Sequence, residues 1–268
     1  MVGQVMSKED KRIEREVFEK IESRRVKRVK DKDLFETVEE VFDRATLMAL
    51  YELINRGFIR VMHGVVNAGK EARVYWAEDA DGLNVAVKIY LTSTSEFKRS
   101  MLPYIEGDPR FKFAKRDVRS IIYVWARKEY ANLRKAFQVG IRVPKPIAVN
   151  KNILIMDFIG DEGVPAPLLK DYIPEDVENL FREVLKFIQL LYLKAGMVHA
   201  DLSEYNIMVY NDKPVIIDWG QAVILSHPMA DEFLVRDINN ILRFFSRIGS
   251  AVPSFEEVYL WVKGKGQL

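Results

Sequence analysis

The sequence predicts an α+β protein with two lobes, in which a lobe built on an antiparallel sheet precedes a mainly helical lobe. Strand-like segments are concentrated between residues 58 and 156. Apolar residues at three- and four-residue steps predict long helices over residues 117–139, 174–195 and 231–245. With 268 residues and 49% hydrophobic content, the chain is large enough for such a core. The expected parts are a helical extension (1–57), a sheet lobe (58–157) and a helical lobe (158–268).

The N-terminal extension begins with a charged segment that is predicted to be a polar helical arm. Its basic run, residues 24–30, is expected to be a solvated helix face or a mobile arm, and contact with RNA is left open. A second helical segment is expected to end at Asn55-Arg56-Gly57. The apolar positions of this segment are Val38, Val41, Phe42, Leu47, Leu50, Leu53 and Ile54.

Six strands are expected in the sheet lobe, because short β-branched or alternating segments are bounded there by turn residues. They are expected at residues 58–62, 63–68, 72–78, 84–90, 146–149 and 153–156.

The strand over residues 84–90 carries the first candidate site residues. Alternation places Ala86 and Lys88 on one face, about 6–7 Å apart. A small alanine leaves room for an adenine ring, while the lysine reaches the phosphates of the same nucleotide. The alternative is a solvated lysine on an edge strand.

Residues 63–76 predict a glycine loop between two antiparallel strands, because Gly64 and Gly69 let backbone N–H groups approach a phosphate closely. The string nearly matches the Walker A pattern. However, Glu71 stands where that motif needs a hydroxyl for Mg²⁺, and residues 72–77 alternate like a strand where a helix would begin.

A connector over residues 92–115 has no sustained periodicity and is predicted to be loop-like and regulatory, or else an inert mobile loop. Its candidate autophosphorylation sites are Thr92, Ser93, Thr94, Ser95 and Ser100. The following helix places Glu129 within its apolar stripe, where a carboxylate needs a specific partner, and Lys88 is the expected one. The alternative is a solvated Glu129 that pairs with Arg127 or Lys128.

Residues 198–218 carry the strongest functional signal. Two short hydrophobic strands each end at an acid, Asp201 and Asp218, and Asn206 follows the first acid by five residues. Phosphoryl transfer uses one carboxylate to orient the attacking hydroxyl, and a second carboxylate with an amide oxygen to hold Mg²⁺. Each residue alone is an ordinary turn acid or helix cap, but together they fit the H-x-D-x-x-x-x-N and D-x-G spacings of kinase loops.

These motifs resemble the Rio family of atypical serine/threonine protein kinases, most of all its type-one branch, over about residues 35–245. The residues that carry the resemblance are Gly69-Lys70-Glu71-Ala72, Val74-Tyr75, His199 to Asn206 and Ile217-Asp218. It implies a bilobal protein-kinase-like fold with a truncated C-terminal lobe, since the long activation segment of ordinary protein kinases is absent. The high charge, few glutamines and lack of cysteine indicate a thermophilic source, which the family resemblance makes archaeal.

The resemblance also implies ATP with Mg²⁺ or Mn²⁺ as cofactors, and Asp201, Lys88 and Glu129 as catalytic residues. The implied activity is autophosphorylation or ATP hydrolysis. The implied partner, in ribosome biogenesis, is the pre-ribosomal small subunit, its proteins or its RNA. By the same resemblance Met156 is the gatekeeper next to adenine. The residues expected to contact nucleotide or metal are Val65, Lys70, Glu71, Ala72, Val74, Ala86, Lys88, Met156, Asp157, Ile159, Glu204, Asn206 and Asp218.

Two other functions stay open at this point. Small-molecule phosphotransferases of the aminoglycoside or choline kinase type also use H-x-D-x-x-x-x-N and often an I-D-W run, which is present as Ile217-Asp218-Trp219. A nucleotide-gated assembly factor without a protein substrate would carry the same catalytic residues.

Two further residues are expected to support the catalytic loop. His199 is predicted to brace it. The resemblance to kinase-like folds implies that Asp237, which lies on an apolar helical face, accepts hydrogen bonds from the loop backbone. The alternative for Asp237 is an exposed acid paired with Arg236.

The composition favours a soluble cytoplasmic protein, expected to be a monomer, although an oligomer is left open. The net charge is +2 and cysteine is absent, so neither a global nucleic-acid field nor a disulfide framework is expected. No apolar run approaches the ~20 residues of a membrane span, and the N-terminus has no signal-peptide pattern.

Overall fold

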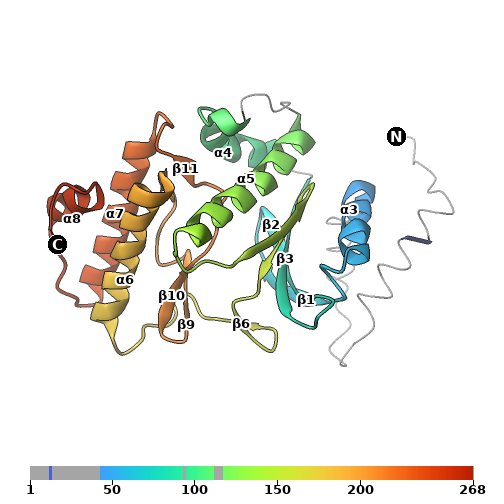
Figure 1. Cartoon of the computed structure of the whole chain (residues 1–268), viewed down its shortest axis with the longest axis horizontal. Coiled ribbons are helices and arrows are strands. Elements are labelled where there is room, and N and C mark those ends of the chain that lie inside the picture. The colour runs from blue at the N-terminus through green and yellow to red at the C-terminus, as the bar shows by residue number, and fades with distance from the viewer. Residues whose placement is uncertain (1–11, 14–42, 93–94, 112–116, 268) are drawn as a thin grey trace. The chain divides into compact units, whose positions relative to one another are not determined.

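A computed structural model describes residues 12–13, 43–92, 95–111 and 117–267 of the chain (Figure 1). The described residues fall into two compact units. The first takes in those within Met1–Lys98, Arg116–Arg127 and Ile147–Phe158, and the second those within Arg99–Lys115, Lys128–Pro146 and Ile159–Leu268. The basic run at residues 24–30 and the first part of the predicted helical extension lie outside the described residues.

The first unit is built on a five-stranded sheet with the order β1-β2-β3-β5-β4. Its strands are β1 (Val61–Ala68), β2 (Ala72–Glu78), β3 (Asn84–Tyr90), β4 (Pro146–Asn150) and β5 (Ile153–Asp157). The neighbours β1 and β2, β2 and β3, and β3 and β5 pair antiparallel. The strands predicted at 72–78 and 84–90 are therefore confirmed.

The prediction of separate strands at 58–62 and 63–68 is wrong, because β1 is one strand. The pairing of β1 with β2 shifts register between Met62 and Val65 and again between Val65 and Asn67. Such irregularities are β-bulges, which interrupt the alternation of side chains without ending the strand. Gly64 lies in the first of them, and in the sequence it resembles a boundary.

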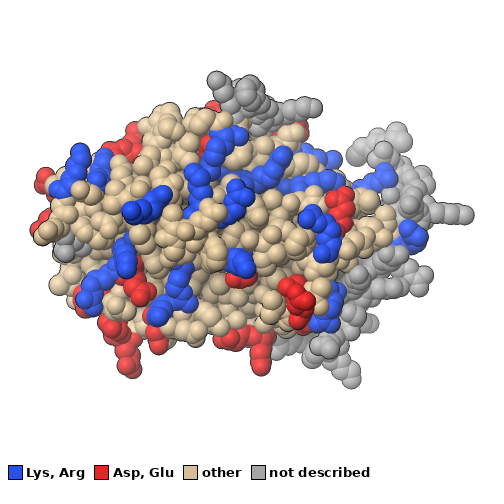
Figure 2. Space-filling view, viewed as in Figure 1, with Lys and Arg blue, Asp and Glu red and all other residues tan. Residues whose placement is uncertain are grey.

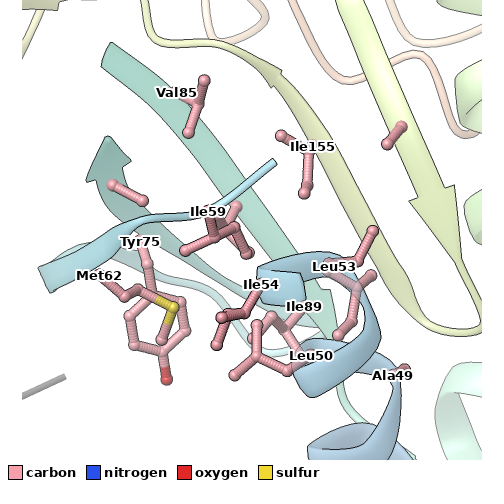
Figure 3. Packing of buried hydrophobic residues seen from close by; sticks show 14 of the residues in the cluster. Ala49, Leu50, Leu53, Ile54, Ile59, Met62, Tyr75, Val85, Ile89 and Ile155 are labelled. Atoms are coloured by element: carbon pink, nitrogen blue, oxygen red, sulfur yellow. The ribbon is translucent and has the colours of Figure 1, made fainter. Parts of the chain in front are cut away.

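One face of the sheet packs against helix α3 (Arg44–Asn55). The helix begins at Asp43, whose side chain caps it by accepting the N–H of Thr46 at 2.8 Å. Figure 3 shows Leu50, Leu53 and Ile54 of α3 in one cluster with side chains from the strands. These apolar side chains are nearly all inaccessible to water, so they form the core of this unit.

A buried polar pair ties α3 to the sheet. The amide nitrogen of Asn152 donates to the carbonyl of Tyr90 at 2.9 Å and to Oγ1 of Thr46 at 3.0 Å. The Thr46 hydroxyl lies 3.3 Å from Oδ1 of Asn152, to which it donates. Because neither Asn152 nor Thr46 reaches water, each depends on the other for its hydrogen bonds.

The connector predicted as loop-like contains a helix, which corrects that prediction. Helix α4 spans Ser95–Ile105, and a 3₁₀ turn, η1, spans Pro109–Phe111. Of the residues from 100 onward in α4, only Met101 and Ile105 are fully buried, one turn apart, and Pro103 lies between them. A proline is unusual inside a helix, so its presence argues against a helix in the sequence. The hydroxyls of Ser93 and Thr94 lie outside the described residues.

Helix α5 (Val118–Gln138) confirms the helix predicted over residues 117–139. The division between the two units falls within it, between Arg127 and Lys128.

In the second unit, helices α6 (Val177–Leu190) and α7 (Ala230–Arg247) lie side by side, and α8 (Phe255–Val262) packs on both (Figure 1). Phe181 of α6 and Phe245 of α7 meet with ring centroids 4.6 Å apart. The end of α6 is a π-helical turn over Leu191–Ala195, closed by Gly196 at a φ of 63°. This left-handed conformation favours glycine and turns the chain directly into β8.

Three short antiparallel strand pairs complete the second unit. Strand β8 (Met197–Val198) pairs with β11 (Val223–Ile224), β9 (Ile207–Tyr210) with β10 (Lys213–Ile216), and β6 (Gly160–Asp161) with β7 (Val164–Pro165). The β9–β10 turn has positive φ at both Asn211 and Asp212, as in the tight turns that suit the twist of a hairpin. Strands β8 and β10 are the hydrophobic segments predicted to precede the two site acids.

Both signs of charge occur on the face shown in Figure 2, as expected from a net charge of +2. Among the described residues, no helix is both long and apolar enough to span a membrane.

Replacing Asn152 with alanine is expected to lower the free energy of unfolding by about 2–3 kcal/mol, because it removes three hydrogen bonds and leaves the Thr46 hydroxyl buried without its partner. Urea unfolding of purified protein measures this. The matched control is Asn55→Ala at the exposed end of α3, which is expected to change stability by less than about 0.5 kcal/mol. Equal effects of the two variants would contradict the predicted role of the buried pair.

Candidate functional site

Asp201 and Asn206 come together in the loop that follows β8. Asn206 donates from Nδ2 to Oδ2 of Asp201 at 3.0 Å and to the backbone carbonyl of Asp201 at 2.8 Å. Gln221 donates from Nε2 to the same Oδ2 of Asp201 at 3.1 Å. Two residues singled out by their spacing therefore form one hydrogen-bonded pair, and the sequence motifs did not indicate Gln221.

Asp218 follows β10 at a φ of 62°, a conformation that few residues other than glycine adopt. The next residue, Trp219, is fully buried and donates its indole N–H to the carbonyl of Ile216 at 3.0 Å. On the other side, the N–H of Ile217 donates to the carbonyl of Asn206 at 3.0 Å. These bonds fix the turn around Asp218, whose own side chain is exposed.

The two acids are close enough for their charges to interact. Burial raises the pKa of Asp201, and the negative charge of Asp218 raises it further. The hydrogen bond from Asn206 and the charge of Arg236 act in the opposite direction. A cation between such carboxylates would relieve their repulsion.

The available donor atoms fit a magnesium ion. Mg²⁺ binds oxygen ligands and is usually held by one or two carboxylates together with the phosphates of a substrate. The amide nitrogen of Asn206 already donates twice to Asp201, so the carbonyl oxygen of its side chain is the atom available to a cation. With the exposed carboxylate of Asp218, this oxygen makes a suitable ligand pair.

A buried acid on α7 holds the loop that carries Asp201. Asp237 is only 1% exposed and accepts the N–H of Ala200 at 2.8 Å and that of Leu202 at 2.9 Å. The prediction that Asp237 binds loop backbone is confirmed, and the alternative of an exposed acid is wrong. Burial raises the pKa of Asp237 to about 7, although both hydrogen bonds favour the charged form. Arg236 adds a hydrogen bond to the carbonyl of Ala200.

His199 supports the same loop from within the core. Its Nε2 lies 3.1 Å from the carbonyl of Ile217, so Nε2 carries the proton and donates it. The ring packs edge-on against Trp219 with centroids 4.8 Å apart. Among the described residues, its buried Nδ1 has no hydrogen-bond partner. Burial lowers the pKa of His199 to about 4, so the ring is neutral and acts as a brace.

Two consecutive charged residues of α5, Lys128 and Glu129, are both buried. Glu129 is 1% exposed, so the alternative of a solvated Glu129 is wrong. Lys128 is fully buried, and its Nζ donates to the carbonyls of Gly220, at 2.8 Å, and Ala222. Burial, aided by the charge of Arg110, lowers the pKa of Lys128 to about 7.

Asn132, one turn after Lys128, donates from Nδ2 to the carbonyls of Trp219 and Ala222, both at 2.9 Å. The sequence motifs missed Lys128 and Asn132. Their spacing was the available signal, since both fall in the stripe of Trp125 and Leu133, where a polar residue needs a defined partner.

In the first unit, strand register brings several predicted residues onto one face of the sheet. Lys88 of β3 lies opposite Val74 of β2, and Ala86 lies opposite Met156 of β5. Residues directly opposite in antiparallel strands point to the same side. Val74, Ala86, Lys88 and Met156 therefore share the face that the alternation of β3 predicts.

The predicted glycine loop joins β1 to β2. Lys70 and Glu71 are exposed in it, and the N–H of Gly69 donates to the carbonyl of Ala72 at 3.1 Å, closing the turn. Val65 lies opposite Tyr75 in the neighbouring strand. The Walker A alternative is wrong, because a strand follows the loop where that motif requires a helix.

The remaining predicted residues lie in separate places along the chain. Asp157 ends β5 opposite Val85, and Ile159 follows in the second unit, where its carbonyl accepts the N–H of Ala166 at 2.9 Å. The carboxylate of Glu204 accepts a hydrogen bond from Arg247 at 3.0 Å.

The sequence pattern of the RIO domain matches residues 73–258. RIO-type serine/threonine-protein kinase Rio1 of Haloferax volcanii is 42% identical over 198 residues, which cover 74% of this chain and 67% of that protein. Rio1 of Methanocaldococcus jannaschii is 43% identical over 199 residues, with coverage of 74% and 67%. Rio1 of Thermoplasma acidophilum is 47% identical over 165 residues, or 62% of this chain and 86% of that protein. The chain thus spans about two thirds of the length of two of these relatives.

Solved structures of similar fold include the Rio2 kinase from Chaetomium thermophilum in an ADP/Mg²⁺-phosphoaspartate complex. It has a TM-score of 0.60 and 22% identity, and the match covers 83% of this chain and 66% of that chain. A second structure of that kinase has a TM-score of 0.61 and 23% identity, with coverage of 82% and 68%. The predicted kinase-like α+β fold is confirmed.

Acidification is expected to destabilise the protein through His199. Its pKa is lowered from 6.5 to about 4 in the folded state, so the stability that depends on the neutral ring is complete above pH 6.5 and is lost as the pH falls from there toward 4. Between pH 7 and pH 5 the free energy of unfolding should fall by about 2 kcal/mol more in the wild type than in His199→Gln. Urea unfolding at both pH values measures this difference, to which the other titrating groups contribute equally in the two proteins. An equal fall in both would show that His199 is not the cause.

Proposed function

The chain belongs to the RIO family of serine/threonine protein kinases, and we propose that it transfers the γ-phosphoryl group of ATP to the hydroxyl of a serine or threonine. The observation that carries the proposal is the pairing of Asp201 with Asn206, beside Asp218, on a loop held by Asp237. Two carboxylates and an amide in this arrangement are the groups that phosphoryl transfer needs.

In this proposal Asp201 orients the acceptor hydroxyl and accepts its proton. The hydroxyl oxygen forms a bond to the γ-phosphorus, the bond from that phosphorus to the bridging oxygen breaks, and ADP leaves. The raised pKa of Asp201 makes its carboxylate a stronger proton acceptor than that of an ordinary aspartate. Asn206 and Asp218 hold Mg²⁺ or Mn²⁺, which neutralises phosphate charge when bound.

The first unit contributes residues to nucleotide binding in the same proposal. Lys88 binds the phosphates, and Ala86 and Val74 leave room for the adenine. The pairing of Glu129 with Lys88 stays a prediction from the sequence. Their common sheet face supports the assignment of Ala86, Val74 and Lys88 to one ligand. Met156 lies beside the base, and the backbone of Asp157 and Ile159 binds its edge.

We extend the proposal to the biological setting that the family resemblance implies. The acceptor is a serine or threonine of this chain, in the segment that contains α4, or of a small-ribosomal-subunit precursor in the cytoplasm. A nucleotide-gated assembly factor that hydrolyses ATP is the second candidate, because the same residues would position water. The relatives named above are protein kinases, which favours a protein acceptor over a small molecule.

Replacing Asp201 with alanine is expected to lower the turnover number about 10²- to 10⁴-fold, because the variant lacks the group that receives the acceptor proton. Nucleotide affinity should be largely kept, since Asp201 acts on the acceptor. Single-turnover kinetics with labelled ATP and nucleotide titration measure the two quantities. Asp81→Ala, in the exposed turn between β2 and β3, is the control and should match the wild type. Lost nucleotide binding with normal single-turnover chemistry would contradict the role of Asp201.

The distribution of the label identifies the acceptor in the same experiment. Purified protein, alone and with small-subunit particles, is incubated with γ-labelled ATP, and the label is mapped on this chain, on the particles and as free phosphate. Label on serine or threonine supports the kinase. Free phosphate alone, with no modified hydroxyl, would overturn it in favour of an ATPase.

A further inference from the structure

Side chains of α5 form hydrogen bonds with the backbone of the four residues that follow Asp218. Within this segment, Trp219–Ala222, three backbone carbonyls accept hydrogen bonds from Lys128 and Asn132. Both donors are fully buried. A buried lysine amine is costly to keep without hydrogen bonds, and the bonds of Lys128 to the carbonyls of Gly220 and Ala222 fix the path of Trp219–Ala222.

The orientation of Asn132 is set in turn by an arginine from the turn η1. Arg110 donates from Nη1 to Oδ1 of Asn132 at 2.9 Å. Since the guanidinium has only donors, it selects the amide oxygen, and the amide nitrogen must then face the carbonyls of Trp219–Ala222. Without Arg110, the amide of Asn132 loses the contact that specifies this orientation.

Arg110 is itself held in a fork by Asp108. Nε of Arg110 lies 2.9 Å from Oδ1 of Asp108, and Nη2 lies 2.6 Å from Oδ2. The carboxylate of Asp108 is inaccessible to water, and its pKa is lowered below its ordinary value because the bonds and charge of Arg110 outweigh the cost of burial. Such a two-point contact between planar groups fixes direction as well as distance.

The segment Trp219–Ala222 also contacts the proposed site directly. Its residue Gln221 donates a hydrogen bond to Asp201, as Asn206 does. A shift of this segment would therefore move the residue next to Asp218 and break the Gln221 contact with Asp201 at the same time.

A second contact joins the end of α4 to the segment that follows β11. Nε2 of His227 lies 3.0 Å from the carbonyls of both Pro103 and Glu106. At Gly107 an added Cβ would lie 2.9 Å from Pro228, so the segments that contain these two residues are in close contact there. Residues 103–111 are thus docked at more than one point.

We infer that Asp108, Arg110, Lys128 and Asn132 are positioning residues. Through them, the docking of residues 108–111 fixes the backbone of Trp219–Ala222. This segment in turn fixes the position of Asp218 and the contact of Gln221 with Asp201. The inference rests on the proposed function, because it assigns these residues to the geometry of phosphoryl transfer. The four residues act on the proposed site through the backbone of Trp219–Ala222. Undocking of residues 108–111 would weaken metal-dependent turnover while the nucleotide-binding face of the first unit stays intact.

The test compares Arg110→Gln with Arg134→Gln, a matched change at an exposed position of α5. The first readout is hydrogen–deuterium exchange of the peptide that contains residues 217–226, without nucleotide. The second is the Mg²⁺ concentration for half-maximal turnover, with kcat and the KM for ATP. Loss of the charge-assisted hydrogen bonds from Arg110 to Asp108 and of its bond to Asn132 predicts an increase of about tenfold in loop exchange and in the half-saturating Mg²⁺ concentration in Arg110→Gln only. The KM for ATP should change little.

Arg110→Lys separates positioning from general stability, because lysine keeps the charge beside Asp108 but lacks the fork that also reaches Asn132. Its loop exchange should lie between the wild type and Arg110→Gln, and it provides the measurement if Arg110→Gln does not fold. Loop exchange in the Arg110 variants equal to that of Arg134→Gln overturns the inference, whether or not the protein is active. If the wild type transfers no phosphoryl group while loop exchange still rises in Arg110→Gln, the proposed function fails and the docking link stands.

Discussion

The two hydrogen bonds from the loop backbone to the carboxylate of Asp237 are the contact on which the candidate site depends. They hold the N–H groups of Ala200 and Leu202, the residues on either side of Asp201. Ala200 has a φ of 66°, which is costly for a residue with a Cβ and persists only where neighbouring contacts fix it. The 18-residue helix α7 supplies the carboxylate from its buried face, so the core of the second unit fixes the position of Asp201.

The same arrangement recurs around Asp218. There the backbone of the following residues is held by Lys128 and Asn132 of α5, again from the buried side. In both places the groups that would meet the substrate lie on short loops, while buried polar side chains on long helices hold the backbone of those loops. Removing such a side chain leaves buried backbone groups without partners, so the cost appears in both stability and geometry.

The sequence predicted those features that depend on local spacing. The common face of Ala86 and Lys88 follows from the two-residue period of a strand, and the pairing of Asp201 with Asn206 joins residues five apart. The sequence did not predict the role of Lys128, because the backbone carbonyls that it binds are more than 90 positions away. Any residue type supplies such a carbonyl. Helix α4 was missed because a proline, Pro103, lies inside it. Distant backbone partners and short helices leave little trace in periodicity.

Metal binding by Asp218 tests the proposed site most directly. Isothermal titration with a non-hydrolysable ATP analogue, with and without Mg²⁺, compares the wild type with Asp218→Asn. If Asp218 is a metal ligand, Mg²⁺ strengthens nucleotide binding in the wild type, and the variant loses this gain while its metal-free affinity is unchanged. A full Mg²⁺-dependent gain in Asp218→Asn would contradict the site proposed around Asp201, Asn206 and Asp218.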